Sequence, residues 1–216
     1  MKPEEIKIFS GFIDYTLFAA DATRADIEKL CAEAREKSYH AVCVNGARVE
    51  LAHAVLEESE VRVVGLVGFP LGAADKDIKY YEAEAAVDYG AQEIDFVINI
   101  GRLKEGDHRY VLREMRDVVE AADECPVKAV LETHLLTREE KILACQLALD
   151  SGVQFVSTAT DFHSPAASID DVKLLRETLG KDFGIKVAGQ IRDYTTAQKL
   201  IEAGVTRIGL MADVNF

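Results

Sequence analysis

The feature of this sequence that most limits its fold is a regular alternation between short apolar segments and segments with helical periodicity. Continuous apolar runs of four to eight residues are typical of strands that are covered on both faces. They therefore predict a parallel sheet that is buried between helices. The predicted strands are residues 11–16, 41–45, 61–68, 93–100, 127–132, 153–158, 185–188 and 207–211.

Helical patterns lie between these predicted strands. The clearest one begins at Thr23, which stands three residues before Asp26 as in a capping box. Ile27, Leu30 and Cys31 then follow on one apolar stripe. Similar stripes predict helices at residues 78–89, 110–122, 139–151, 169–179 and 194–203. Several of these stripes are followed directly by glycine, which is common just after the end of a helix.

Eight strands that alternate with helices predict a (β/α)₈ TIM barrel. A doubly wound open sheet is the alternative, but no GxGxxG segment follows the first predicted strand. No linker or low-complexity segment divides the chain, so we expect one domain over residues 1–216. Because only residues 212–216 follow the last predicted strand, the final helix should be missing or reduced to a turn. In such a barrel the chemistry takes place at the carboxyl ends of the strands.

Composition bears on partners and location. Lysine and arginine total 25 against 38 acidic residues, a net charge of −13 that disfavours binding to nucleic acid. The longest apolar runs are far shorter than the roughly 18 residues of a membrane span, so we expect no membrane partner. No basic-then-apolar leader opens the chain, and the four cysteines form no CxxC pair. We therefore expect reduced thiols and a cytoplasmic location.

Several motifs at the predicted strand ends resemble those of the deoxyribose-phosphate aldolase family. They are "IDYT", "VCVN", "VGFPLGA", "EIDFVINIG", "ETHLLT" and "IKVAGQIR", and they occur in the family's order over nearly the whole chain. The resemblance implies a class I aldolase, in which a lysine on the sixth strand forms a Schiff base with the donor aldehyde. A lysine on the seventh strand and an aspartate on the fourth would assist proton transfer, and a phosphate site would lie beside strands seven and eight.

The same resemblance assigns candidate site residues. Asp95 stands at the position of the family's catalytic aspartate, and Lys186 stands at the position of its assisting lysine. We expect no metal and no cofactor in this site. The positions expected to contact a ligand are Asp14, Thr16, Cys43, Ser157 and Gly189.

The chain departs from the family pattern at its sixth strand. The family reads like "FVKTSTGF" there, whereas this chain reads "FVSTATDF", so Ser157 stands where the Schiff-base lysine would be. The phosphate region departs as well, since Gln190 replaces the second glycine of a Gly-Gly turn. Backbone N–H groups and serine hydroxyls bind phosphate, whereas apolar side chains and carboxylates do not. We therefore expect the phosphate site to be lost, with apolar or acidic residues in its place at Leu210, Met211, Ala212 and Asp213.

Two functions remain open from the residues. One is a divergent aldolase that acts on a small carbonyl compound through Lys186 and Asp95. The other is a non-catalytic barrel kept for binding a small carbonyl or sugar ligand, or for a protein interaction, with a homodimer as one compatible assembly. An amine nucleophile needs a lowered pKa, and Asp95 would instead raise the pKa of Lys186. Standard class I activity is therefore expected to be weak or absent.

The same end of the barrel offers residues for two other chemistries. Ser157 would act as a nucleophile only with a base within hydrogen-bond reach, such as His134 or His163. A metal site formed by these two histidines with Asp95 and Glu132 is the other alternative. Neither idea has a supporting motif, because the chain contains no GxSxG and no HExxH.

Overall fold

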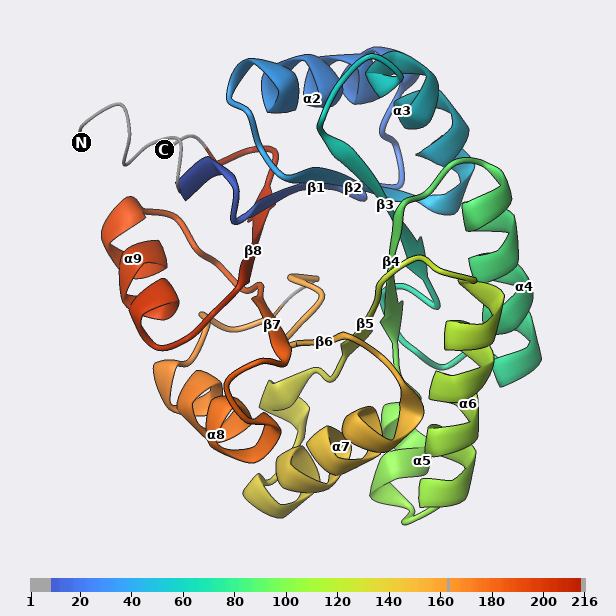
Figure 1. Ribbon diagram of the computed structural model, residues 1–216, viewed down its shortest axis with the longest axis vertical. Helices are drawn as coiled ribbons and strands as arrows, with labels where there is room; N and C mark the ends of the chain where they lie inside the picture. The colour runs from blue at the N-terminus through green and yellow to red at the C-terminus, as the bar shows by residue number, and fades with distance from the viewer. Residues whose placement is uncertain (1–8, 163, 215–216) are drawn as a thin grey trace.

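The computed structural model describes residues 9–162 and 164–214. Its centre is a closed barrel in which the strands follow their order in the chain (Figure 1). β1 pairs in parallel with both β2 and β8, which closes the barrel and excludes the open-sheet alternative. The strands are β1 (Ile13–Leu17), β2 (Ala41–Asn45), β3 (Arg62–Val67), β4 (Glu93–Val97), β5 (Val127–Val130), β6 (Phe155–Ser157), β7 (Gly184–Val187) and β8 (Arg207–Met211).

Helices surround the barrel as an outer ring (Figure 1). The predicted start of the first of them is confirmed, because Thr23 and Asp26 form a reciprocal capping box. The helices are α2 (Arg24–Glu36), α3 (Val49–Leu56), α4 (Lys76–Asp88), α5 (Ile100–Lys104), α6 (His108–Ala121), α7 (Arg138–Ser151), α8 (Ile169–Leu179) and α9 (Tyr194–Glu202), with 3₁₀ turns η1 (Gly46–Arg48) and η2 (Thr133–Leu135).

Helices α3 and α5 were not predicted from the sequence. Helix α3 follows a 3₁₀ turn, and the residue before it, Arg48, makes no side-chain cap hydrogen bond, so it lacks a start signal. Helix α5 shortens the predicted strand 93–100, because the side chain of Asn99 accepts a hydrogen bond from the Arg102 N–H and turns the chain into a helix. The Asn99 N–H in turn donates to the Glu114 carboxylate at 2.8 Å.

Successive side chains along each strand point alternately into the barrel and into the layer between the barrel and the helices. On β1, Tyr15 packs between the barrel and α2, while Asp14 and Thr16 face the inside of the barrel. Apolar groups fill the layer between strands and helices. Inside the barrel, a small apolar cluster on β2 and β3 lies beside charged side chains from the other strands.

The chain after β8 forms a turn at residues 212–213, which agrees with the predicted reduction of the final helix. Among the described helices, none combines the length and the apolar character that crossing a bilayer would require.

Candidate active site

Lys186 lies at the centre of the barrel between two carboxylates. Its Nζ is 2.7 Å from Asp95 Oδ2 and 2.8 Å from Asp14 Oδ2. The same ammonium group contacts the sulfur of Cys43 at 3.4 Å. All four side chains are buried, and they come from β7, β4, β1 and β2. The structure therefore brings together four of the residues predicted from the sequence.

These contacts fix the charge of Lys186. Burial alone would lower the pKa of its amine, but the negative charges of Asp14 and Asp95 outweigh this effect and hold the pKa well above its usual value. At neutral pH the side chain is therefore an ammonium ion. An amine attacks a carbonyl carbon only through its free lone pair, so Lys186 has to lose a proton before it can act as a nucleophile.

Lys128 is a second buried lysine in the site, and it was not predicted from the sequence. It lies on β5 next to Asp95 on β4, with Nζ 2.8 Å from Asp95 Oδ1 and 2.7 Å from Glu93 Oε2. Burial opposes ionisation of Asp95, but Lys128 and Lys186 together lower the pKa of its carboxyl group. The available signal was the lysine at the second position of the apolar strand "VKAV", where a charge requires buried partners.

The ion pairs continue toward the amino-terminal end of the barrel. Although burial would raise the pKa of Glu93, a hydrogen bond from His40 and the charge of Lys128 lower it strongly. Arg62 also contacts this carboxylate, at 3.1 Å. Alternating charges thus run through the barrel interior. We call the set formed by Glu93, Lys128, Asp95, Lys186 and Asp14 the charge column.

Ser157 lies beside Lys186, because the two residues are register partners on β6 and β7. Its hydroxyl group is buried and donates a hydrogen bond to the Ala159 carbonyl at 3.4 Å. His134, the proposed base, is paired with Glu132 at 3.2 Å. Within the described part of the chain, Ser157 therefore has no paired base, and His163 lies outside the described residues.

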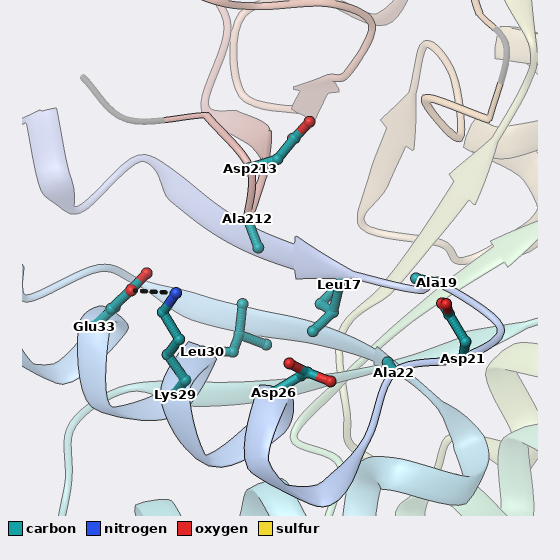
Figure 2. Close-up of a pocket in the computed structure, with 10 residues that line it drawn as sticks. All are labelled: Leu17, Ala19, Asp21, Ala22, Asp26, Lys29, Leu30, Glu33, Ala212 and Asp213. Atoms are coloured by element: carbon teal, nitrogen blue, oxygen red, sulfur yellow. Dashed lines mark ion pairs between the residues drawn. The ribbon is translucent and has the colours of Figure 1, made fainter.

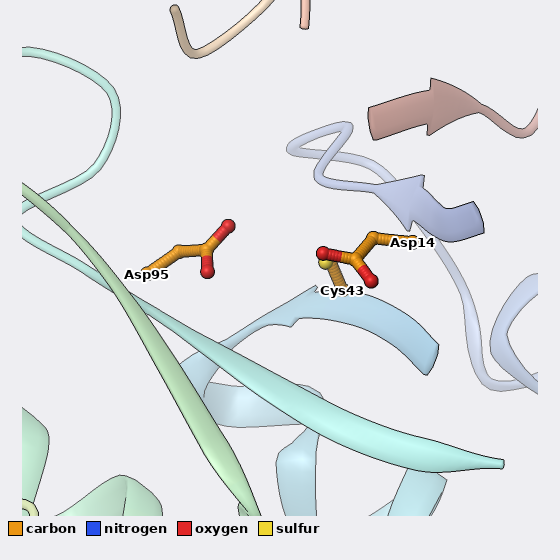
Figure 3. Close-up of side chains that lie close together, drawn as sticks. All are labelled: Asp14, Cys43 and Asp95. Atoms are coloured by element: carbon orange, nitrogen blue, oxygen red, sulfur yellow. The ribbon is translucent and has the colours of Figure 1, made fainter. Parts of the chain in front are cut away.

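Among the described residues, the group of side chains that could hold a metal ion includes neither His134 nor Glu132. It is the trio Asp14, Cys43 and Asp95, which places ligand atoms within 4.8 Å of one another (Figure 3). The ammonium of Lys186 already contacts all three side chains. Burial also raises the pKa of the Cys43 thiol to about 12, so the sulfur is protonated at neutral pH. This trio is built around an ammonium ion.

A cavity of ≈ 20 Å³ opens above the charge column at the carboxyl ends of the strands. We call it the mouth cavity. Its polar lining residues include Thr16 and Lys186, and its apolar lining residues include Phe69 and Met211. The space is about enough for one water molecule, so a ligand of sugar size has to displace some of these side chains. The ring of Phe18 packs against Phe69 at 5.0 Å and against Phe162 at 6.2 Å between ring centroids.

Gly189 begins the turn that follows β7. Its φ is +119°, and a Cβ at this position would lie 2.7 Å from the Pro165 carbonyl oxygen, so the turn requires glycine. The next residue, Gln190, donates its backbone N–H to Asp161 Oδ1 at 3.0 Å. Asp161 also lines the mouth cavity, a position that the sequence analysis did not single out. Gly189 and Ser157 are not among the described residues that line this cavity.

The end of β8 only partly matches the predicted change in the phosphate region. Met211 lines the mouth cavity as expected. Leu210 instead packs in the core between strands and helices, so its assignment to the phosphate corner was wrong. The reason is strand alternation, since Gly209 and Met211 both face the barrel interior. Asp213 lines a separate cavity.

This separate cavity lies outside the barrel, between α2 and the ends of β1 and β8 (Figure 2). Its volume is ≈ 340 Å³, and the charged residues that line it are four acids and one lysine. Lys29, the lysine that lines it, is paired with Glu33 at 3.8 Å, as the dashed line in Figure 2 shows. The Tyr15 hydroxyl lies 2.7 Å from the Glu33 carboxylate. The larger cavity thus lies apart from the charge column.

Comparison with known proteins gives a consistent result. Residues 12–202 match the DeoC/LacD family of aldolases. The chain is 49% identical over 205 residues to the deoxyribose-phosphate aldolase of Alkaliphilus oremlandii, which covers 94% of this chain and 92% of that protein. It is 47% identical over 207 residues to the Thermococcus gammatolerans deoxyribose-phosphate aldolase, with 94% and 92% covered. The tetrameric deoxyribose phosphate aldolase from Aeropyrum pernix superposes with a TM-score of 0.88 at 26% identity, over 94% of this chain and 87% of that one.

Proposed function

Because this chain belongs to the DeoC/LacD family of aldolases, we propose that it is a divergent member that binds a small carbonyl compound or sugar at the mouth cavity. In this proposal its class I aldolase activity is weak or absent. The observation that carries the proposal is the position of Lys186, which is held between Asp14 and Asp95 beside the neutral side chain of Ser157.

A class I aldolase begins with attack by an unprotonated amine on the carbonyl carbon, followed by loss of water to give an imine. Among the described residues that line the mouth cavity, Lys186 is the one lysine. Its raised pKa keeps the lone pair protonated, and Ser157 supplies no second amine. The first covalent step is therefore disfavoured at neutral pH.

The site nevertheless has groups that suit a small hydroxy-carbonyl ligand. The Lys186 ammonium is a hydrogen-bond donor, and the Asp95 carboxylate is an acceptor for a ligand hydroxyl. Phe69 and Met211, which line the same cavity, offer apolar surface to the carbon skeleton. A mixed lining of this kind is typical of sites for small polar molecules.

A second candidate function is residual aldolase chemistry through Lys186, which is favoured by the contact of this residue with the mouth cavity. It requires transfer of a proton away from the ammonium group before attack. Asp14 and Asp95 are the adjacent acceptors, at 2.8 and 2.7 Å.

The test is reductive trapping. The protein is incubated with acetaldehyde and borohydride at neutral pH, and adducts are counted by intact-mass spectrometry and located by peptide mapping. We expect most of the protein to remain unlabelled within the barrel. The Lys186→Met variant serves as the control for adducts on surface lysines. A stoichiometric adduct at Lys186 would refute the proposal in favour of the residual aldolase.

A further inference from the structure

The side chain of Asp161, which follows β6, reaches into the turn that follows β7. Asp161 lies in the loop after β6, and its carboxylate accepts a hydrogen bond from the Gln190 N–H in the turn after β7, at 3.0 Å. The backbone of Gly189 is close enough to the same carboxylate to help lower its pKa. Gly189 and Gln190 have φ values of +119° and +48°. Successive N–H groups that converge in this way form a concave nest that binds anions. We call the N–H groups of Gly189 and Gln190 the amide nest.

Several contacts hold this nest in place. Asp161 and Gln190 both adopt a positive φ, which is uncommon outside glycine. The Gln190 side chain donates to the Ser164 carbonyl at 2.8 Å, and the Ala167 N–H donates to the Gly189 carbonyl at 2.9 Å. The turn after β7 is therefore fastened to the loop after β6 by contacts that are independent of the Asp161 carboxylate.

The carboxylate of Asp161 is half-buried and faces the mouth cavity. Burial raises the pKa of its carboxyl group, and the backbone groups of Gln190 and Gly189 offset only part of this effect. The charge of Asp213 acts in the same direction as burial, while Arg192 acts against it. The nest is thus occupied by a negative group that belongs to the protein itself.

We propose that Asp161 is a built-in anion that fills the amide nest and makes the mouth cavity select uncharged ligands over anionic ones. An anionic ligand would have to displace the carboxylate from the nest and would be repelled by its charge. The ligand class is therefore a small uncharged hydroxy-carbonyl compound or polyol. This inference rests on the proposed ligand site and specifies what that site accepts.

The test removes the carboxylate and measures binding of inorganic phosphate. In the Asp161→Gly variant the two N–H groups are free, and the positive φ suits glycine. Phosphate is titrated into ¹⁵N-labelled protein, and the backbone amide signals of Gly189 and Gln190 are followed. We expect phosphate to bind at these amides at least about tenfold more tightly in Asp161→Gly than in the original protein. Asp161→Ala is the second variant if the glycine variant does not fold, as judged by circular dichroism.

Two matched variants distinguish the effect of filling the amide nest from the effect of the negative charge of Asp161. Asp161→Asn keeps an acceptor oxygen in the nest without the charge, and we expect it to bind phosphate much less tightly than Asp161→Gly. Asp213→Asn removes one nearby negative charge and leaves the nest filled, so no gain is expected. Equal gains in Asp161→Asn and Asp161→Gly would show that charge alone is responsible, and would overturn the role of the nest.

Phosphate binding by the original protein that equals binding by Asp161→Gly would also overturn the inference, as would a folded Asp161→Gly variant that gains no affinity. These outcomes are independent of imine formation, because the amide nest contains neither Lys186 nor Ser157. The borohydride experiment can therefore fail while this one succeeds, and the reverse also holds.

Discussion

Ser157 and Lys186 are direct register partners on β6 and β7, so their side chains occupy neighbouring places in the barrel wall. The charge of a side chain at position 157 therefore acts directly on the amine of Lys186. A neutral hydroxyl leaves this amine with two carboxylate neighbours and no opposing cation on the β6 side. A second lysine there would disfavour the charged form of both amines.

The first prediction concerns this pair. Ser157→Lys should form an imine with acetaldehyde that borohydride traps, because two adjacent lysines lower the pKa of one of them. The same variant should cleave deoxyribose 5-phosphate slowly, because in our proposal Asp161 fills the amide nest and repels the phosphate that would otherwise help position the reacting carbon. The measurement is cleavage rate together with adduct mass, and Ser157→Met is the control of similar length without an amine.

Asp161→Gly and Gln190→Gly, added to Ser157→Lys, should raise the cleavage rate further. Asp161→Gly frees the amide nest, and Gln190→Gly places glycine at a position whose positive φ disfavours other residues. The prediction fails if the single variant is already as fast as the triple one. Leu210 is left unchanged, since its side chain packs in the core.

The second prediction tests the carboxylates that protonate Lys186. Asp14→Asn removes one of the two negative neighbours, so the pKa of Lys186 should fall. Trapping with acetaldehyde should then begin at a lower pH than in the original protein. The pH dependence of adduct yield at Lys186 is the measurement, and Thr16→Val, which changes another mouth residue without altering charge, is the control. Identical pH profiles for Asp14→Asn and the original protein would contradict the assigned role.

The third prediction concerns acid stability. The folded pKa of Glu93 lies well below its ordinary value of 4.5, so its ionised form stabilises the fold above that pH. This contribution is lost as the pH falls below the unfolded pKa toward the folded one. Glu93→Gln should therefore unfold at a lower urea concentration at pH 7. Its free energy of unfolding should fall by roughly 3–5 kcal/mol, the cost of breaking a buried ion pair.

The same variant should lose less stability than the original protein when the pH is lowered from 7 to about 3, because the titrating group is absent. The exposed Glu58→Gln is the matched control and should change neither quantity much. Parallel acid profiles for Glu93→Gln and the original protein would show that Glu93 does not carry the effect.

The fourth prediction uses the four free cysteines. Burial raises the pKa of the Cys43 thiol to about 12, and Cys43 is fully shielded from solvent. Cys125 is partly exposed, although burial raises its thiol pKa as well. Iodoacetamide at pH 8 should therefore label Cys125 first and leave Cys43 unlabelled, as read by peptide mass spectrometry. Full labelling in denaturant is the control, and faster labelling of Cys43 than of Cys125 would contradict the buried site.

The apolar strand patterns of the sequence predicted the barrel, and the resemblance to the aldolase family predicted that Lys186 and Asp95 share one site. Lys128 was missed, since its partners Glu93 and Asp95 come from a neighbouring strand and only the register places them together. Leu210 was placed wrongly because the inward or outward phase of β8 is set by its pairing with neighbouring strands.

Asp161 could not be assigned from the sequence for a different reason. An acidic residue in a polar loop is ordinarily a solvated side chain. Its contact with Gln190 depends on the positive φ values of both residues, which the sequence does not specify.

The closed amino-terminal end of the barrel determines how a ligand enters and leaves the site. Lys128 and Arg207 lie over the ring of Phe155, at 5.9 and 5.6 Å from its centroid, and the charge column fills the space above. Because Glu93 and Lys128 are shielded from solvent, the charge column is reached from the other end of the barrel, through the mouth cavity. A ligand bound at this end therefore has to leave through the opening by which it entered.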